Sequence, residues 1–449
     1  MNLASVKQKV HRYSHTCTHR EYLVLAFPLI LSGVSTPLLG VVDTAVVGRI
    51  QDPTALGGVA IAAVIFNTLY WLLGFLRVTT SGFTSQADGA KNEEGIMLAL
   101  YRPMIIAILM GLLFILFQKP IIHLSLLLMG GNTATNALAE TYFLIRIWGA
   151  PFILLSYVTI GWLVGLGKVK MSLFLQIGMN VLNIVLDIVF VLGLHMGVAG
   201  VAYATLIAEV SSVIVGMFLI FQTNKSRFFI PSLSALIKKD TLTQMFLVNR
   251  DHFLRTLCLV TMTGILTSKG ASMGELTLAA NAILLQIQYV MAYLFGGFAN
   301  ASSILVGRAF GGKNTSLYFR ALSLSATWGI ATAILLSFLT ILFGDFIVSL
   351  FTTIHEVRET THVFLFWMLL FPLVGFWGLQ LEGIFSGATD AKSVRNSIFI
   401  ALLVFLAAII GLVPVFGNHG VWMAFILFSL SRSVFLSLYL KKLTNRLVG

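Results

Sequence analysis

Two acidic residues lie inside long apolar segments of this sequence, where an ionised side chain is costly. Asp43 lies about six residues before Arg49, and Asp187 about six residues before Gly193. If both segments are helices, a rise of about 1.5 Å per residue puts both carboxylates roughly 9 Å below the same face of the bundle. An acid in hydrocarbon is usually kept where it faces protein or a water-filled path. We therefore predict that Asp43 and Asp187 form a proton-coupling site.

Polar side chains accompany the second acid. Asn180, Asn183 and Asp187 follow i, i+3, i+7 spacing, which places them on one face of a helix. Thr205, about five residues into the next apolar segment, reaches the same level. These groups are candidates for lining a substrate cavity, although interhelical hydrogen bonding that only stabilises the bundle is an alternative for the asparagines and Thr205.

Five further charges fall inside apolar segments and leave their roles open: Arg77, Arg146, Glu209, Arg255 and Glu382. Any of them could form internal ion pairs, and the arginines could instead extend toward the membrane surface or mark the true helix ends. Glu382 is the one acid deep in the second half. It is a reserve candidate for a second cation or substrate site.

Two motifs resemble enzyme signatures but lack their context. Gly307–Asn314 (GRAFGGKN) approaches a phosphate-binding loop, yet it ends in Asn and follows an apolar helix. Gly270–Gly274 (GASMG) fits the G-x-S-x-G pattern of hydrolases without a preceding strand. The nine histidines show no paired metal-ligand spacing. We expect no enzyme activity, no metal and no cofactor.

The composition indicates that lipid surrounds most of the chain. Of 449 residues, 58% are hydrophobic and 10% charged, which is far more apolar than a water-soluble domain. Long uncharged segments favour helices over a barrel, so the predicted class is an all-α integral membrane protein. The formal net charge of +12 is spread between apolar segments rather than gathered on one face, which argues against nucleic acid.

The apolar segments predict about twelve transmembrane helices. We place them near residues 22–48, 58–84, 96–118, 136–159, 170–193, 199–222, 249–269, 277–306, 317–343, 360–385, 394–416 and 419–440. Every second connection is basic, as are both terminal segments, so the positive-inside rule places both termini in the cytoplasm.

The two halves of the sequence resemble each other. Ser85–Asn92 (SQADGAKN) matches Gly307–Asn314 at a separation of about 222 residues, and the same spacing links Gly161 to Gly383. Duplication of a six-helix unit predicts two lobes facing a central cavity. The expected divisions are a cytoplasmic tail (1–20), an N-terminal lobe (21–222), a cytoplasmic linker (223–248), a C-terminal lobe (249–440) and a second tail (441–449).

Four segments carry a resemblance to a known family: Phe27–Ile50, Asn183–Ala202, Asn249–Leu257 and Gly383–Ser397. Together they resemble the multidrug and toxic compound extrusion (MATE) transporters, in the DinF-like branch. The resemblance implies two six-helix lobes, alternating access, and coupling through acids that match Asp43 and Asp187. It also implies supporting polar groups that match Asn183 and Thr205, and a helix bend at a proline that matches Pro28.

We therefore expect a secondary transporter in the bacterial inner membrane that exchanges cationic or lipophilic drugs and toxic metabolites for protons. The expected partners are these small molecules, protons and membrane lipids, and we expect a monomer that binds no nucleic acid. A lipid-linked precursor flippase and a sodium-coupled exporter remain alternatives. The sodium-coupled branch carries a Glu inside helix 7, where this sequence has Asp251 and Arg255 near the start of that helix.

Overall fold

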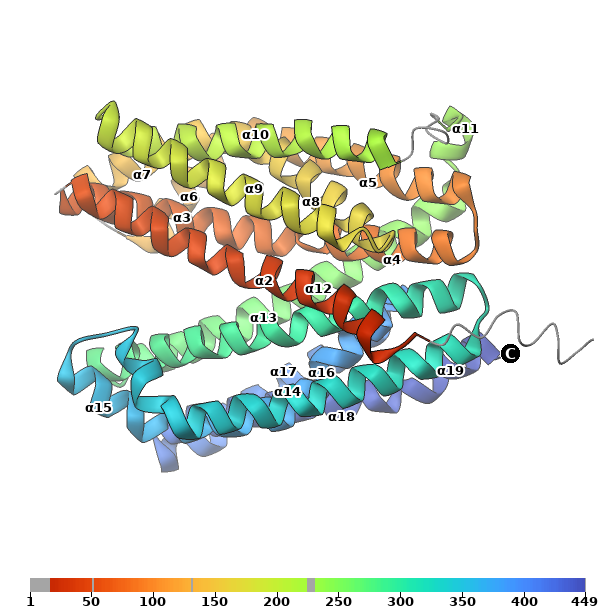
Figure 1. The fold of residues 1–449 in the computed structure, drawn as a ribbon. Coiled ribbons are helices and arrows are strands. Elements are labelled where there is room, and N and C mark those ends of the chain that lie inside the picture. The colour runs from red at the N-terminus through yellow and green to blue at the C-terminus, as the bar shows by residue number, and fades with distance from the viewer. Residues whose placement is uncertain (1–16, 51, 131, 224–230, 449) are drawn as a thin grey trace, which may run out of the picture.

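The computed structural model describes residues 17–50, 52–130, 132–223 and 231–448. In the first of these ranges the helical backbone is described throughout, but the side chains of residues 36–44 and 50 lie outside the description. Across the described residues every regular element is a helix, so the predicted all-α class is confirmed. The helices form two bundles lying side by side (Figure 1).

Lobe 1 is the bundle formed by residues 19–223. Its elements are α2 (His19–Val47), η1 (Gly48–Ile50), α3 (Pro53–Leu73), α4 (Phe75–Gly89), α5 (Glu93–Leu116), α6 (Gln118–Met129), α7 (Thr133–Arg146), η2 (Ile147–Gly149), α8 (Ala150–Gly165), α9 (Val169–Asp187), the π-helical η3 (Ile188–Gly193) and α10 (Gly197–Thr223).

Lobe 2 is the bundle formed by residues 239–448, which a short helix, α11 (Leu233–Leu236), precedes. Its elements are α12 (Lys239–Ala271), α13 (Glu275–Gly311), α14 (Thr315–Ser349), α15 (His355–Phe364), α16 (Phe366–Gly387), α17 (Ala391–Phe416), α18 (Asn418–Leu438) and α19 (Leu440–Val448).

The element boundaries repeat along the chain. The continuous span Pro53–Gly89, made of α3 and α4, corresponds to α13 at Glu275–Gly311, and both ends are shifted by the spacing of the sequence repeat. The span Thr133–Gly165 ends at Gly165, whose repeat counterpart, Gly387, is the last residue of α16. A Cβ on Gly161 would overlap the carbonyl oxygen of Arg77, and its counterpart Gly383 lies in the same way against Ala299. The internal repeat predicted from the sequence is thus confirmed.

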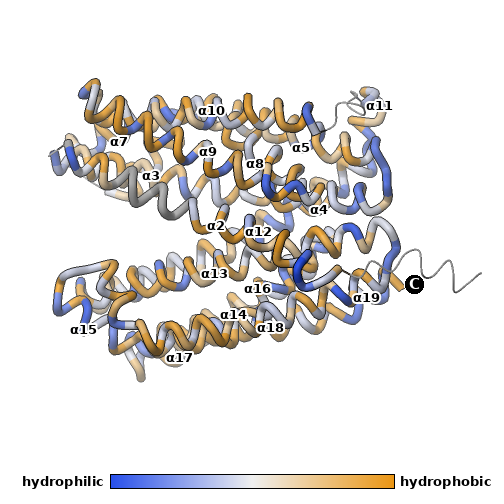
Figure 2. The backbone as a smooth tube through the Cα atoms, in the orientation of Figure 1, coloured by the Kyte–Doolittle hydropathy of each residue, from blue (hydrophilic) through white to orange (hydrophobic). Residues whose placement is uncertain are grey.

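The helices are long and apolar enough to cross a membrane. Ten spans in the described part of the chain meet length and hydropathy criteria for crossing, and α2 and the more charged α12 bring the number to the predicted twelve. Apolar residues run along the helices and polar ones gather at the two ends (Figure 2). Large apolar side chains such as Leu128 and Ile410 are about three-quarters exposed, as expected of a surface that faces lipid.

Helix boundaries differ from the sequence expectations mainly at connections. Helix α12 begins at Lys239 rather than near residue 249, so part of the expected linker is helical. An additional helix, α6, follows Phe117, and the fourth span contains a 3-10 turn just before Pro151. A proline has no amide donor, and it is tolerated in the first turn of a helix, which explains why α8 begins there.

Helix α2 connects the two lobes. At its start, the hydroxyl of Tyr22 lies 2.8 Å from that of Ser302 on α13 and donates to the carbonyl oxygen of Phe298 over 3.0 Å. Farther along, Ser35 accepts a hydrogen bond from Asn180 on α9. The helix runs obliquely across the boundary between the bundles, and both its start and the C-terminus lie at one end of the molecule (Figure 1). We call this the terminal end.

Candidate functional site

The predicted polar face of helix α9 is present and buried inside lobe 1. Asn180, Asn183 and Asp187 are at most 6% exposed, and Asp187 has no exposed surface. Gln176, one turn earlier, extends the face and is also buried. We call these four residues the α9 polar stripe. Because an amide in a low-dielectric interior must find hydrogen-bond partners, the stripe determines how the neighbouring helices pack against α9.

The stripe contacts one helix on each side. Asn180 donates to the hydroxyl of Ser35 on α2 over 3.2 Å. Asn183 donates to the hydroxyl of Thr205 on α10 over 3.2 Å, and that hydroxyl in turn donates to the carbonyl oxygen of Val201. The structure thus pairs Asn183 with Thr205, and it pairs Asn180 with Ser35, a residue that the sequence did not single out.

The carboxylate positions lie beyond these contacts. Asp187 is the last residue of α9 and is followed directly by the π-helical turn η3, a distortion that is common at functional sites. Asp43 lies in α2, but its side chain is outside the described residues. Along the backbone, Asp43 is eight residues beyond Ser35 and Asp187 is seven beyond Asn180. Since Ser35 and Asn180 are hydrogen-bonded, the two acidic positions fall at a similar level of their helices.

This arrangement suits the binding of a proton or a cation. A buried carboxylate can exchange its charge for a proton, and side-chain amides and hydroxyls offer both donors and acceptors to either form. Among the described residues, no three His, Cys, Asp or Glu side chains gather as metal ligands.

Lobe 1 also contains a charged pair between the end of α7 and α10, and its acid, Glu209, lies one turn beyond Thr205. Arg146 lies 3.7 Å from the carboxylate of Glu209 on α10, and both side chains are largely buried. The guanidinium also lies over the ring of Phe66, 4.6 Å from its centroid, and donates to Tyr142. Of the open alternatives for Arg146 and Glu209, the structure therefore supports an internal ion pair. Arg77 is the third residue of α4 and is partly buried.

Lobe 2 contains a buried cluster that the sequence indicated only in part. The carboxylate of Glu382 on α16 contacts the guanidinium of Arg255 on α12 and that of Arg432 on α18. All three side chains are at most 20% exposed. Glu382 is therefore already paired with two cations. Arg432 was not among the predicted residues, although a charge inside the apolar segment 419–440 was a signal for it.

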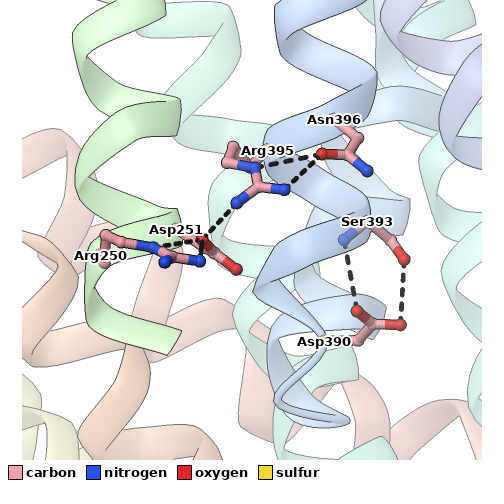
Figure 3. A network of polar contacts seen from close by, with 6 residues as sticks. All are labelled: Arg250, Asp251, Asp390, Ser393, Arg395 and Asn396. Carbon is pink, nitrogen blue, oxygen red and sulfur yellow. Dashed lines mark hydrogen bonds and ion pairs between the residues drawn. The ribbon is translucent and has the colours of Figure 1, made fainter. Parts of the chain in front are cut away.

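A related network lies one turn closer to the start of α12. Asp251 accepts hydrogen bonds from Arg250 and, over 2.7 Å, from Arg395 on α17, while Arg395 also donates to Asn396 (Figure 3). Nearby, Asp390 caps the start of α17 by accepting from Ser393. Like Glu382, Asp251 contacts two arginines.

Pro28 lies in the third turn of α2, and its side chain is buried. Helix α2 is continuous from His19 to Val47. Pro28 lies between Tyr22, which contacts lobe 2, and Ser35, which contacts the α9 polar stripe. A proline at this point removes one backbone hydrogen bond, so one weak point of the helical ladder lies between the two contacts, and Pro37 introduces another beyond Ser35.

Comparison with known proteins agrees with the fold and the repeat. The MatE family model matches residues 28–189 and 253–411, one stretch in each lobe. The DNA damage-inducible protein F of Escherichia coli (strain K12) is 36% identical over 413 residues, which cover 92% of this chain and 90% of that protein. The multidrug export protein MepA of Staphylococcus aureus (strain MSSA476) is 21% identical and covers 91% of both chains.

Solved structures share the architecture. An outward-facing multidrug resistance MATE family transporter of the MOP superfamily superposes with a TM-score of 0.85, at 21% identity and over 95% of this chain and 96% of that one. A MOP superfamily transporter from Pyrococcus furiosus with a binding pocket of reversed polarity superposes with a TM-score of 0.82, at 21% identity and the same coverage.

Three observations lead to one assignment. The family model matches a stretch in each lobe, one relative shares more than a third of the aligned residues, and the solved structures share the two-lobe helical fold. The chain belongs to the MATE family of multidrug and toxic compound extrusion transporters, in its DinF-like branch.

Proposed function

We propose that this chain is a proton-coupled efflux antiporter of the bacterial inner membrane. It exchanges cationic or lipophilic small molecules for protons by alternating access, as a monomer with both termini in the cytoplasm. The observation that carries the proposal is the fully buried Asp187 at the end of the α9 polar stripe, at the level of Asp43 on the helix that connects the lobes.

The physical basis is the cost of charge in this place. An ionised carboxylate buried among apolar helices is costly unless a proton, a cation or hydrogen-bond donors compensate it. Proton uptake by Asp43 or Asp187 removes charge from the contact between α2 and α9, and a cationic substrate compensates the same charge. Proton and substrate therefore exclude each other, which is the requirement for exchange.

The curated relatives support the substrate class. MepA is named as a multidrug export protein, and a further relative, NorM of Photorhabdus laumondii, as a probable multidrug resistance protein at 24% identity over 85% of both chains. A central cavity lined mostly by apolar side chains, with a few polar groups, fits substrates that are lipophilic and varied in shape.

In lobe 2, protons are favoured over sodium because the largely buried acids Asp251 and Glu382 already have arginine partners. Glu382 contacts Arg255 and Arg432, and Asp251 contacts two arginines as well. Sodium would have to displace a guanidinium from a largely buried ion pair, at the cost of leaving that cation uncompensated.

Transport assays in proteoliposomes test the coupling ion directly. Vesicles containing the purified protein are loaded with a fluorescent cationic dye, and a proton gradient or a sodium gradient is imposed alone. We expect dye exchange with the proton gradient and none above protein-free vesicles with sodium. Equal exchange under a sodium gradient at constant pH would reject proton coupling.

The arginines of lobe 2 favour a second candidate function, the movement of anionic lipid-linked precursors. Two acids, Asp251 and Glu382, are surrounded by four guanidinium groups, those of Arg250, Arg255, Arg395 and Arg432. Paired in this way, the cluster keeps an excess of positive charge that could attract a phosphate group. Competition in the same dye assay distinguishes the two functions: a polyprenyl phosphate that inhibits exchange more strongly than a lipophilic cation of similar size would favour the flippase.

A further inference from the structure

The two repeated segments singled out by the sequence meet at the terminal end of the molecule. Ser85–Asn92 contains the end of α4 in lobe 1, and Gly307–Asn314 contains the end of α13 in lobe 2. The candidate coupling site uses neither of them. Their side chains nevertheless make direct hydrogen bonds and an ion pair between the lobes.

From lobe 2, Arg308 reaches two groups of lobe 1. Its Nε lies 2.7 Å from Oδ2 of Asp88, and its Nη2 donates to the carbonyl oxygen of Leu166 over 2.9 Å. Leu166 is the C-terminal cap of α8. The last carbonyls of a helix lack backbone donors and carry partial negative charge, so a guanidinium is a favourable partner for them.

From lobe 1, Gln86 makes the corresponding contact in the opposite direction. Its Nε2 donates to the carbonyl oxygen of Gly387, the last residue of α16, over 2.8 Å, and to the hydroxyl of Thr389 over 3.2 Å. Gln86 and Arg308 occupy equivalent positions of the internal repeat, and α8 and α16 are equivalent helices. Each residue therefore binds the end of the corresponding helix in the other lobe.

Glycines let the two segments approach this closely. A Cβ on Gly89 would overlap the carbonyl oxygen of Arg308, and a Cβ on Gly311, its repeat counterpart, would overlap the carbonyl oxygen of Gln86. At these two glycines the backbones of the two lobes are thus in direct contact, with no side chain between them. Such a contact can separate without repacking of either lobe.

We propose that Gln86 and Arg308, together with Asp88, form a reciprocal clasp that closes the transporter at its terminal end and opens when the lobes separate there. The clasp uses no residue of the coupling site. It rests on the proposed function in one respect, that the protein works by alternating access. Asp88 and Arg308 are each about one-third exposed, so water can replace their contacts when the clasp opens.

The clasp is symmetric in its hydrogen bonds but not in its charge. The repeat position of Asp88 in lobe 2 is occupied by Phe310, which forms no ion pair, while Arg308 corresponds to the neutral Gln86. Since hydrogen bonds from a charged donor are stronger than neutral ones, the half of the clasp made by Arg308 should contribute more to closure.

Thiol accessibility tests the clasp without any transport step. In a chain lacking Cys17 and Cys258, both replaced by Ala, the reporter is Ser85→Cys, because Ser85 is fully buried and lies against Gly307 of the other lobe. Inside-out membrane vesicles are treated with a membrane-impermeant maleimide, and the initial rate of labelling is measured. The control is Lys313→Gln. Lys313 is exposed and lies in the same segment as Arg308, Gly307–Asn314, so this change also removes a cation there.

We expect Arg308→Gln to raise the labelling rate about tenfold, because it loses a charged hydrogen bond and an ion pair. Asp88→Asn should raise the rate about two- to fivefold, and Lys313→Gln should leave it unchanged. Equal rates for Arg308→Gln and Lys313→Gln would overturn the clasp.

A second measurement covers the case in which the reporter disturbs folding. Lys170 and Lys392 are exposed, repeat-related residues at the same end, one in each lobe. Spin labels placed at both should show a longer distance population in Arg308→Gln than in Lys313→Gln, and identical distance distributions would also overturn the proposal. Neither the labelling rate nor the spin-label distance depends on the coupling ion or the substrate. A failure of the proposed function can therefore be distinguished from a failure of the clasp.

Discussion

Asn180 on α9 donates a hydrogen bond to the hydroxyl of Ser35 on α2 over 3.2 Å, inside lobe 1. On the other side of Pro28, Tyr22 holds the start of the same helix against Ser302 of lobe 2. Helix α2 is thus attached to both lobes, with a proline between the attachments. A change of charge beside the α9 polar stripe can therefore act on the boundary between the lobes through one helix.

Replacing Asp43 by Asn should abolish proton-driven efflux while the protein still folds. The amide keeps the size of the carboxyl group but cannot release or bind a proton in the relevant range. The measurement is dye exchange by the purified variant in proteoliposomes under a proton gradient. Asp187→Asn should reduce exchange in the same way.

The control for both variants is Asp52→Asn. Asp52 is exposed and caps the start of α3 through Thr54, a role that Asn fills about as well. We expect exchange by this variant to equal that of the unmodified chain. Undiminished exchange by Asp43→Asn would remove Asp43 from the mechanism and leave it a structural residue.

Replacing Pro28 by Ala should impair transport more than substrate binding. Alanine restores an amide donor and strengthens the helical ladder between Tyr22 and Ser35, so α2 resists bending. Binding is measured by fluorescence polarisation of a cationic dye, and transport by exchange in proteoliposomes. The control is Pro414→Ala, which changes a proline inside α17 at an exposed position. If Pro28→Ala transports as well as Pro414→Ala, bending at this point is not required.

The polar face of α9 could be predicted because the information is local. Helical periodicity alone places Asn180, Asn183 and Asp187 on one side, and an acid in an apolar helix must face protein or water. The same periodicity extends to Gln176. What it cannot specify is the partner: Ser35 is distant in the sequence, and only the packing of α2 against α9 brings it to Asn180.

The charged cluster of lobe 2 depends on long-range packing more than the polar face of α9 does. Arg255, Glu382 and Arg432 lie on three helices that are far apart in sequence, and no spacing rule links them. The sequence could mark each charge as costly, but not which charges compensate one another. By contrast, the repeat was visible as local similarity, and it predicted the equivalence of helices that the structure confirms.

A cysteine introduced at Lys239 should react with a thiol reagent added from the cytoplasmic side only. Lys239 begins α12 and is exposed, and the basic connections place this end inside the cell. Ser272→Cys, at the opposite end of the same helix, is the matched control and should react only from the outside. A membrane-impermeant maleimide is applied to spheroplasts and to inside-out vesicles. Labelling of the Lys239 variant in intact spheroplasts would reverse the topology.

Replacing Glu382 by Gln should strongly destabilise lobe 2. The carboxylate compensates Arg255 and Arg432 in a largely buried place, and breaking such a cluster by removing one partner costs about 3–5 kcal/mol. The measurement is thermal unfolding in detergent micelles, followed by circular dichroism. The control is Glu140→Gln, which breaks an exposed ion pair with Lys119 and should cost at most about 1 kcal/mol.

A second substitution separates loss of charge balance from loss of packing. In Glu382→Gln, both Arg255 and Arg432 lose their carboxylate partner. Adding Arg432→Met leaves only Arg255 without a partner, and a long side chain remains at both substituted positions. We expect this double variant to unfold at a higher temperature than Glu382→Gln alone, because one of the two uncompensated charges is removed. A double variant that is less stable than Glu382→Gln alone, by as much as Arg432→Met destabilises the unmodified chain, would contradict this expectation. The cluster would then contribute through packing, and other groups would compensate the charges of Arg255 and Arg432.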